Sequence, residues 1–121
     1  MRLFVLPLAG LAIIAGGFSD EPGEAQMQQA FETSLKTQVR NTLDFVAETG
    51  GAEAVEKIRQ AGSDRFAIRS FRKLDCSPAG GNGYRCSFAV DVELINGSLE
   101  RRIDGRFAPN AFGGLAFAEE I

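Results

Sequence analysis

The clearest structural pattern in the chain lies in residues 84–97, which read YRCSFAVDVELING. From Tyr84 to Leu94 apolar and polar side chains alternate, which is typical of a strand with one buried face. Asn96-Gly97 then predicts a two-residue hairpin turn, because both residue types accept a positive φ. This turn pairs Ile95 with Ser98 and predicts an antiparallel partner strand directly after it.

The predicted register extends outward from that turn along both strands. It gives three cross-strand pairs: Cys86 with Phe107, Asp91 with Arg102, and Val92 with Arg101. Arg101 is therefore a charged residue on the apolar face of the hairpin. Natural proteins often break a local rule of this kind at functional positions, so Arg101 is a candidate binding residue.

Two further strands are predicted on either side of this hairpin. Before it, residues 66–76 place Phe66, Ile68, Leu74 and Cys76 on one face. Phe71 falls on the opposite face, which indicates a bulge or a second apolar surface. Beyond it, the glycine-rich turns after Pro109 lead to a short last strand over residues 115–121. We therefore expect a four-stranded antiparallel meander.

A long amphipathic helix is predicted ahead of the sheet. Its apolar positions recur every three or four residues: Met27, Phe31, Leu35, Val39, Leu43 and Val46. Gly50-Gly51 is expected to end it, and a short second helix follows over residues 52–61. Both helices packed on the sheet give an α+β fold for a single domain at residues 26–121.

The N-terminus has the features of a secretory signal peptide over residues 1–25. Arg2 precedes an apolar run from Leu3 to Phe18, and acidic residues follow it. A cut after Ala25 fits the small residues that the peptidase requires, and Ala15-Gly16-Gly17 is a second candidate. The alternative is an uncleaved membrane anchor, although the run would span only about 24 Å of a roughly 30 Å hydrocarbon core.

Cys76 and Cys86 point to the same face of consecutive strands, and nine residues separate them. In the oxidising compartment that the leader implies, this arrangement predicts a structural disulfide. Closing so short a loop should stabilise the fold by roughly 2.5–3 kcal/mol in the chain-entropy model. A redox-active pair would need a Cys-x-x-Cys spacing, which is absent.

Composition excludes several classes of function. The chain has 13 basic and 16 acidic residues, and Arg2, Asp20, Glu21 and Glu24 all lie in the leader. The exported part is therefore nearly neutral, which argues against nucleic acid as a partner. The chain contains no histidine, which removes the usual acid–base catalyst and metal ligand. We expect no enzyme, no catalytic residue, no metal and no cofactor.

Three groups of candidate binding residues remain. Arg101 and Tyr84 are polar groups that face the predicted apolar side of the sheet. The loop Ser77–Gly83 offers Ser77, Gly80, Gly81 and Asn82 for recognition, since loops on rigid scaffolds often carry binding. The basic residues Arg69 and Arg72 belong to a local positive patch that could receive an anionic partner, although protection of an edge strand is the favoured interpretation.

The order of a long helix, a short helix and a curled antiparallel sheet resembles the cystatin-like and NTF2-like superfamilies. The segments 73–76, 83–92 and 105–107 look like small exported bacterial proteins of that type. Ser77–Gly83 does not match the Gln-Val-x-x-Gly type of loop found in cystatin inhibitors. The acids and histidine that NTF2-like enzymes place in their pocket are also missing here, so the resemblance carries over no catalytic residue.

These observations leave three functional hypotheses for a periplasmic or secreted protein. The first is a non-enzymatic accessory or binding protein of the cell envelope, whose partner is another envelope or membrane protein. The second is a carrier of a small apolar ligand, with a pocket between helix and sheet gated by Arg101 and Tyr84. The third is a subunit of a membrane complex, held at the inner membrane by its leader with the domain outside the cytoplasm.

Overall fold

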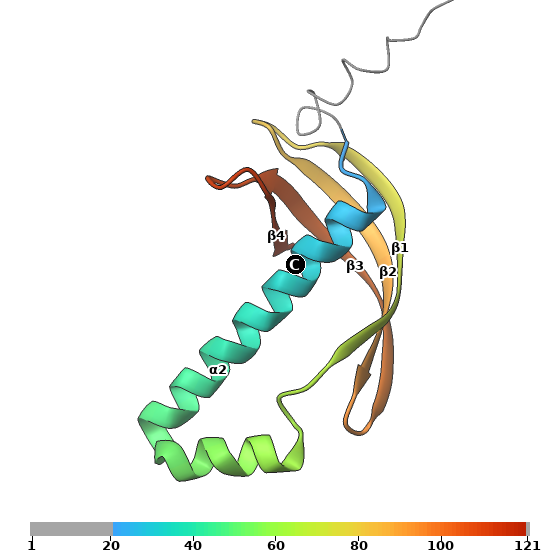
Figure 1. The fold of residues 1–121 in the computed structure, drawn as a ribbon. Helices are drawn as coiled ribbons and strands as arrows, with labels where there is room; N and C mark the ends of the chain where they lie inside the picture. Colours follow the sequence, from blue (N-terminus) through green and yellow to red (C-terminus); the bar gives the residue numbers. More distant parts are fainter. Residues whose placement is uncertain (1–20, 121) are drawn as a thin grey trace, which may run out of the picture.

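Four antiparallel strands form one open, curved sheet, and a long helix lies against its concave side (Figure 1). The structure is a computed structural model that describes residues 21–120. Its elements are α2 (Glu24–Ala61), β1 (Ala67–Pro78), β2 (Tyr84–Leu94), β3 (Gly97–Pro109) and β4 (Leu115–Glu119). The strands lie side by side in the order β1-β2-β3-β4, so the predicted α+β meander is confirmed.

The helix α2 consists of two arms that meet at a break, so the long helix ended by Gly50-Gly51 and the short helix after it are confirmed. The bend lies at Gly51, whose φ of 78° and ψ of 177° form a backbone conformation that essentially only glycine adopts. The arm before the bend packs on the sheet. The arm after it turns back below the hairpin end of the sheet and does not lie on its face (Figure 1), so the expected packing of a second helix on the sheet is corrected.

Only the first turns of α2 are buried against the strands. Met27, Ala30 and Phe31 are buried there. Beyond Phe31 the helix diverges from the sheet (Figure 1), and the next apolar positions, including Leu35 and Val39, stay only half-buried. The predicted apolar stripe is therefore longer than the surface it covers.

Phenylalanine rings form the core between α2 and the sheet. Phe88 of β2 lies at its centre and is fully buried. Its ring stacks on Phe71 at a centroid distance of 4.7 Å and meets Phe31 edge-on at 5.0 Å. The rings of Phe107 and Phe117 complete the cluster from β3 and β4. Such tilted and edge-to-face contacts stabilise beyond the area that they bury.

The register of the β2–β3 hairpin differs from the predicted one. The turn residues are Ile95 and Asn96, and Leu94 pairs with Gly97. Relative to the prediction, each β2 residue has its partner shifted by two positions along β3. The observed pairs are Cys86 with Gly105, Asp91 with Glu100, and Val90 with Arg101. A shift of two preserves the faces, because side chains alternate with a period of two.

The bulge suspected near Phe71 is present. The pairing of β1 with β2 shifts between Ile68 and Ser70, which leaves Arg69 as an extra residue. This extra residue turns Phe71 to the inner face, where it contacts the rings of Phe31 and Phe88. A second shift follows between Lys73 and Cys76.

The predicted disulfide between Cys76 and Cys86 is confirmed. The two residues are direct partners on β1 and β2, and their sulfur atoms are bonded. Cys86 is buried against the core, so the link joins the edge strand to the centre of the fold.

The segment just before α2 is fixed to β1 by Lys73. The Lys73 ammonium donates to the Pro22 carbonyl at 2.7 Å and pairs with the Glu21 carboxylate at 2.5 Å. The Lys73 backbone N–H donates to Glu24 Oε2 at 2.9 Å. Pro22 is buried. Glu21 to Ala25, expected in the leader, therefore includes residues that contact the folded domain.

The rest of the predicted leader, residues 1–20, and the terminal Ile121 lie outside the described residues. Within residues 21–120, no helical stretch combines the length and the apolar character that crossing a bilayer requires.

Candidate functional site

The divergence of α2 from the sheet opens a cleft between them, which we call the α2–sheet cleft. Its volume is about 260 Å³. Most of its lining is apolar and comes from α2, the strands and the segment before β1: Phe31, Leu35, Val39, Phe66, Val90, Val92, Leu94, Leu99, Ile103 and Phe117. Gln38, Arg101 and Glu119 are the polar members of the lining.

Arg101 reaches this cleft because of its register position on β3. It pairs with Val90, whose side chain is buried on the concave face. Its guanidinium lies 3.8 Å from the Glu119 carboxylate of β4, and both side chains are about half exposed. This ion pair is too long for a hydrogen bond, since N–H···O bonds fall near 2.7–3.2 Å. The cleft thus combines an apolar wall with a weakly engaged cation.

A second hollow continues the cleft along α2. It has a volume of about 240 Å³ and lies where the two arms of the bent helix approach each other. The two hollows share Leu35, Gln38 and Val39, and the second adds Leu43 and Ile58. The apolar surface is therefore an elongated groove instead of a compact pit.

Tyr84 does not lie in the cleft with Arg101. Tyr84 pairs with Phe107, whereas Arg101 pairs with Val90, six residues further along β2. At about 3.3 Å per residue this separates the two positions by roughly 20 Å. The structure thus brings Arg101 to the cleft and leaves Tyr84 at the other end of the hairpin.

The loop Ser77–Gly83 is short and closed by backbone hydrogen bonds. The Ala79 N–H donates to the Gly83 carbonyl at 3.0 Å, and Arg106 Nη2 donates to the Gly80 carbonyl at 3.2 Å. The candidate residues Ser77, Gly80, Gly81 and Asn82 are exposed along it. Arg106 therefore ties this loop to β3, and the disulfide lies directly behind it.

Arg69 and Arg72 do not form a purely basic patch. Arg69 is the exposed bulge residue. Arg72 borders a shallow hollow of about 460 Å³, which also contains Asp91, Glu100 and Arg102. Charges of both signs alternate there, so this surface is a mixed one.

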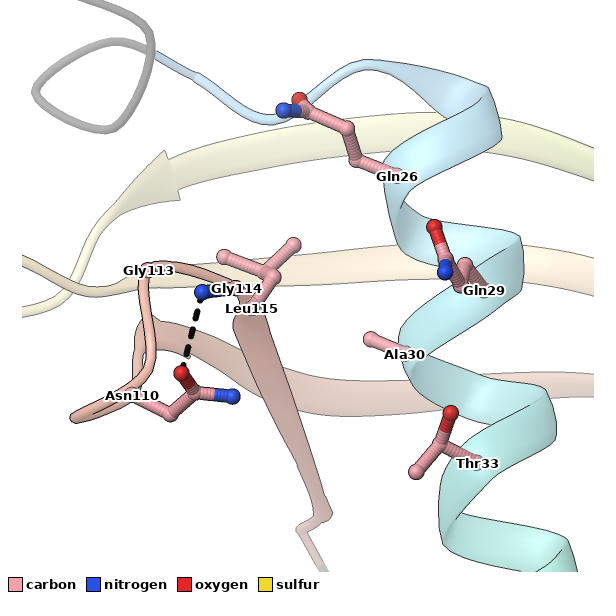
Figure 2. Close-up of a pocket in the computed structure, with 8 residues that line it drawn as sticks. All are labelled: Gln26, Gln29, Ala30, Thr33, Asn110, Gly113, Gly114 and Leu115. Carbon is pink, nitrogen blue, oxygen red and sulfur yellow. Dashed lines mark hydrogen bonds between the residues drawn. The ribbon is translucent and has the colours of Figure 1, made fainter.

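Sequence reasoning missed a polar cleft between the start of α2 and the β3–β4 turn. Figure 2 shows its lining, which includes Gln26, Gln29, Thr33 and Asn110, and its volume is about 340 Å³. Asn110 Oδ1 accepts hydrogen bonds from the backbone of Phe112 and Gly114 at 2.9 and 3.0 Å. The sequence indicates a turn around Asn110, because glycines follow it. It does not indicate that this turn lies next to α2, since the two segments are far apart in the chain.

The resolved pKa shifts lie away from the clefts, at the start of β2. Arg85 Nε donates to Glu120 Oε1 at 2.5 Å. This hydrogen bond lowers the pKa of Glu120 and, together with the charge of the carboxylate, raises the pKa of Arg85. Both groups stay charged near neutral pH, so the pair ties the end of the chain to the sheet.

Residues 21–120 contain no group of three or more histidine, cysteine, aspartate or glutamate side chains placed to hold a metal ion. No family model, curated protein or solved structure matches the chain.

Proposed function

We propose that this chain is a non-enzymatic extracytoplasmic binding protein that holds an apolar ligand in the α2–sheet cleft. The observation that supports this proposal is the apolar cleft of about 260 Å³ with Arg101 in its lining. That volume lies just below the usual range for small-molecule sites, which starts at roughly 300 Å³. The cleft therefore suits a slender ligand more than a bulky one.

Exposed apolar side chains at the cleft support a ligand that covers them. Leu94 and Leu99 line the cleft and keep 43% and 48% of their surface exposed. Removing apolar surface from water is favourable by about 25 cal/mol per Å². A ligand that lies across both leucines would gain this contribution on binding.

The chemistry of the cleft supports binding more than catalysis. Arg101 and Glu119 are its charged groups, and they are paired with each other. The chain lacks histidine, the side chain most suited to proton transfer near neutral pH. We therefore place the protein among carriers and binding proteins.

The disulfide and the sequence of the leader support an extracytoplasmic location, periplasmic or secreted. A helix packed on a curved antiparallel sheet also supports placing the fold in the cystatin-like or NTF2-like group. In this proposal the ligand site occupies the space between helix and sheet.

A fluorescent apolar probe titrated into the exported, disulfide-bonded protein tests this function. We expect saturable binding that Leu99→Gln weakens several-fold, because the substitution places an amide in the apolar wall. Phe112→Gln is the matched control, since Phe112 is 95% exposed and outside the cleft. Equal binding by both variants, or no saturable binding, would reject the cleft as the site.

The exposure of Phe112 favours a second candidate function, the accessory protein that contacts another envelope or membrane protein. Phe112 lies on the β3–β4 turn, at the same end of the sheet as the loop Ser77–Gly83. Site-specific crosslinking from position 112 in the native envelope would test this role. A partner captured there and lost with Phe112→Ala would support it, and no crosslinked partner would contradict it.

A further inference from the structure

We propose that the ligand of the α2–sheet cleft is a single-chain alkyl carboxylate, whose head pairs with Arg101 and whose tail lies along α2. This inference rests on the proposed function and names the chemical class of its ligand. Two observations carry it: a half-exposed guanidinium whose ion pair with Glu119 is too long for a hydrogen bond, and the elongated apolar groove beside it.

The guanidinium of Arg101 has hydrogen-bonding capacity to offer a ligand. A guanidinium carries five N–H donors in a planar fork that fits a carboxylate with two parallel bonds. The Glu119 carboxylate approaches this fork at 3.8 Å, which is beyond hydrogen-bonding distance. Since both side chains are about half exposed, the guanidinium is accessible to a ligand carboxylate that binds beside Glu119.

An anionic head fits this arrangement better than a cationic one. A ligand carboxylate can accept hydrogen bonds from two of the five guanidinium N–H groups. The other N–H donors remain available to Glu119. A cationic head would compete with Arg101 for Glu119 and leave the guanidinium without a partner. The remaining polar lining residue, Gln38, is uncharged.

The shape of the groove favours a flexible chain over a compact ring system. The cleft and the adjoining hollow hold about 260 and 240 Å³ and are joined at Leu35, Gln38 and Val39. Leu43 and Ile58 extend the apolar wall away from Arg101. A tail that starts at Arg101 therefore stays in contact with apolar side chains along α2.

Calorimetric titration with straight-chain carboxylates, each below its micelle-forming concentration, tests the tail. Each buried methylene should tighten binding by about fourfold. We expect this gain from hexanoate to about decanoate, and a plateau once the groove is full. Affinity independent of chain length would overturn the inference.

Decanoate, decanol and decyltrimethylammonium compared on the same protein test the head. We expect decanoate to bind most tightly. Arg101→Gln should weaken decanoate by about two- to fivefold, which is typical of a half-exposed ion pair, and leave decanol unchanged. Arg102→Gln is the matched control: Arg102 pairs with Ala89 and is absent from the cleft lining.

The outcomes separate this inference from the proposed function. Decanol binding as tightly as decanoate, or the ammonium binding best, would overturn the carboxylate ligand while the apolar site stands. Failure of all three ligands together with the apolar probe would reject both. Decanoate binding that is about two- to fivefold weaker in Arg101→Gln but unchanged in Arg102→Gln, with circular dichroism spectra like that of the unsubstituted protein, supports the inference.

Discussion

Gly105 shows how a single residue controls the packing of the last strand. It lies on β3 opposite Cys86 and is buried. A side chain there would collide with the ring of Phe117 and come within 2.9 Å of the Ala118 carbonyl. Glycine is therefore required for close approach, which lets the Phe117 ring join the phenylalanine core.

We predict that Gly105→Ala lowers the free energy of unfolding by about 1–3 kcal/mol, because overpacking forces neighbouring groups to move. Urea denaturation measures this loss. Phe117→Leu provides the partner change for a double-mutant cycle, since a smaller side chain leaves room for the added methyl group. An equal penalty in both backgrounds would show that Phe117 is not the obstacle.

The Arg85–Glu120 pair gives the protein a pH-dependent contact. Its hydrogen bond holds the pKa of Glu120 below the ordinary carboxyl value. A lowered folded-state pKa stabilises the fold above the unfolded-state value, and this contribution is lost as pH falls through the folded-state pKa. We predict that Arg85→Gln raises the pKa of Glu120 toward its ordinary value, measured by carbon NMR titration of the side-chain carboxyl. Arg102→Gln should leave that pKa unchanged.

Among the elements, the β2–β3 hairpin carries the clearest difference from the sequence-based expectation. Asn96-Gly97 predicts a turn centred on those two residues, yet Ile95 and Asn96 occupy it. Gly97 instead begins β3 with a φ of 132°. Gly97 therefore has the expected positive φ, but it is the residue after the turn instead of the second residue of the turn.

This register predicts a new cross-strand contact. Ser98 lies opposite Glu93, so Ser98→Lys should raise stability by about 0.2–1 kcal/mol through an opposite-charge pair. The gain should vanish when Glu93 is changed to glutamine, which a double-mutant cycle by urea denaturation would measure. In the register expected from the sequence, Ser98 faces Ile95 and no coupling to Glu93 would be found.

The segment before α2 is a second element whose role emerged from the structure. Lys73 binds Glu21, Pro22 and Glu24, and the Gly23 N–H donates to Gln26 Oε1 at 2.9 Å. A cut after Ala25 would remove these partners of Lys73. A cut after Gly17 would keep them.

We therefore predict that a chain starting at Glu21 is more stable than one starting at Gln26 by about 1–3 kcal/mol, the range for losing charged hydrogen bonds and a helix cap. Thermal or urea denaturation of the two chains measures the difference. Lys73→Met should destabilise the longer chain and leave the shorter one nearly unchanged. The intact mass of the exported protein shows which cut is used, and equal stability of the two chains would contradict a structural role for residues 21–25.

At the scale of the whole molecule, the disulfide and the phenylalanine core hold the sheet together at one end, while α2 leaves it at the other. The core rings lie under the first turns of the helix. Beyond these turns α2 diverges from the strands, and the space between them is the α2–sheet cleft. The stable end thus supports a more open end that carries the candidate site.

Replacing both Cys76 and Cys86 with alanine should lower the free energy of unfolding by about 2.5–3 kcal/mol, the chain-entropy value for so short a loop. Urea denaturation with and without a reductant measures this effect. The reductant should destabilise the unsubstituted protein and have no effect on the double variant. An unchanged denaturation midpoint after reduction would show that the link adds no stability.

Local patterns in the sequence were sufficient for the elements and their class. Alternation with a period of two predicted the strands, and spacing of three to four predicted α2, because these periods follow from backbone geometry. The disulfide was also predictable, since it depends only on which faces of neighbouring strands the cysteines occupy. Arg101 was expected on the apolar face, and the two-residue shift left it there.

Contacts between distant segments decided the remaining features. Three features depend on such contacts: the hairpin register, the contacts of Lys73 with residues 21–24, and the position of Asn110 next to α2. Each involves segments whose local sequence patterns say nothing about one another. The α2–sheet cleft is the clearest case, because the apolar stripe of α2 looks the same whether or not a strand covers it. Periodicity by itself therefore determined which side chains face inward, and only the folded structure determined which of them find a partner, since burial depends on the relative path of helix and sheet.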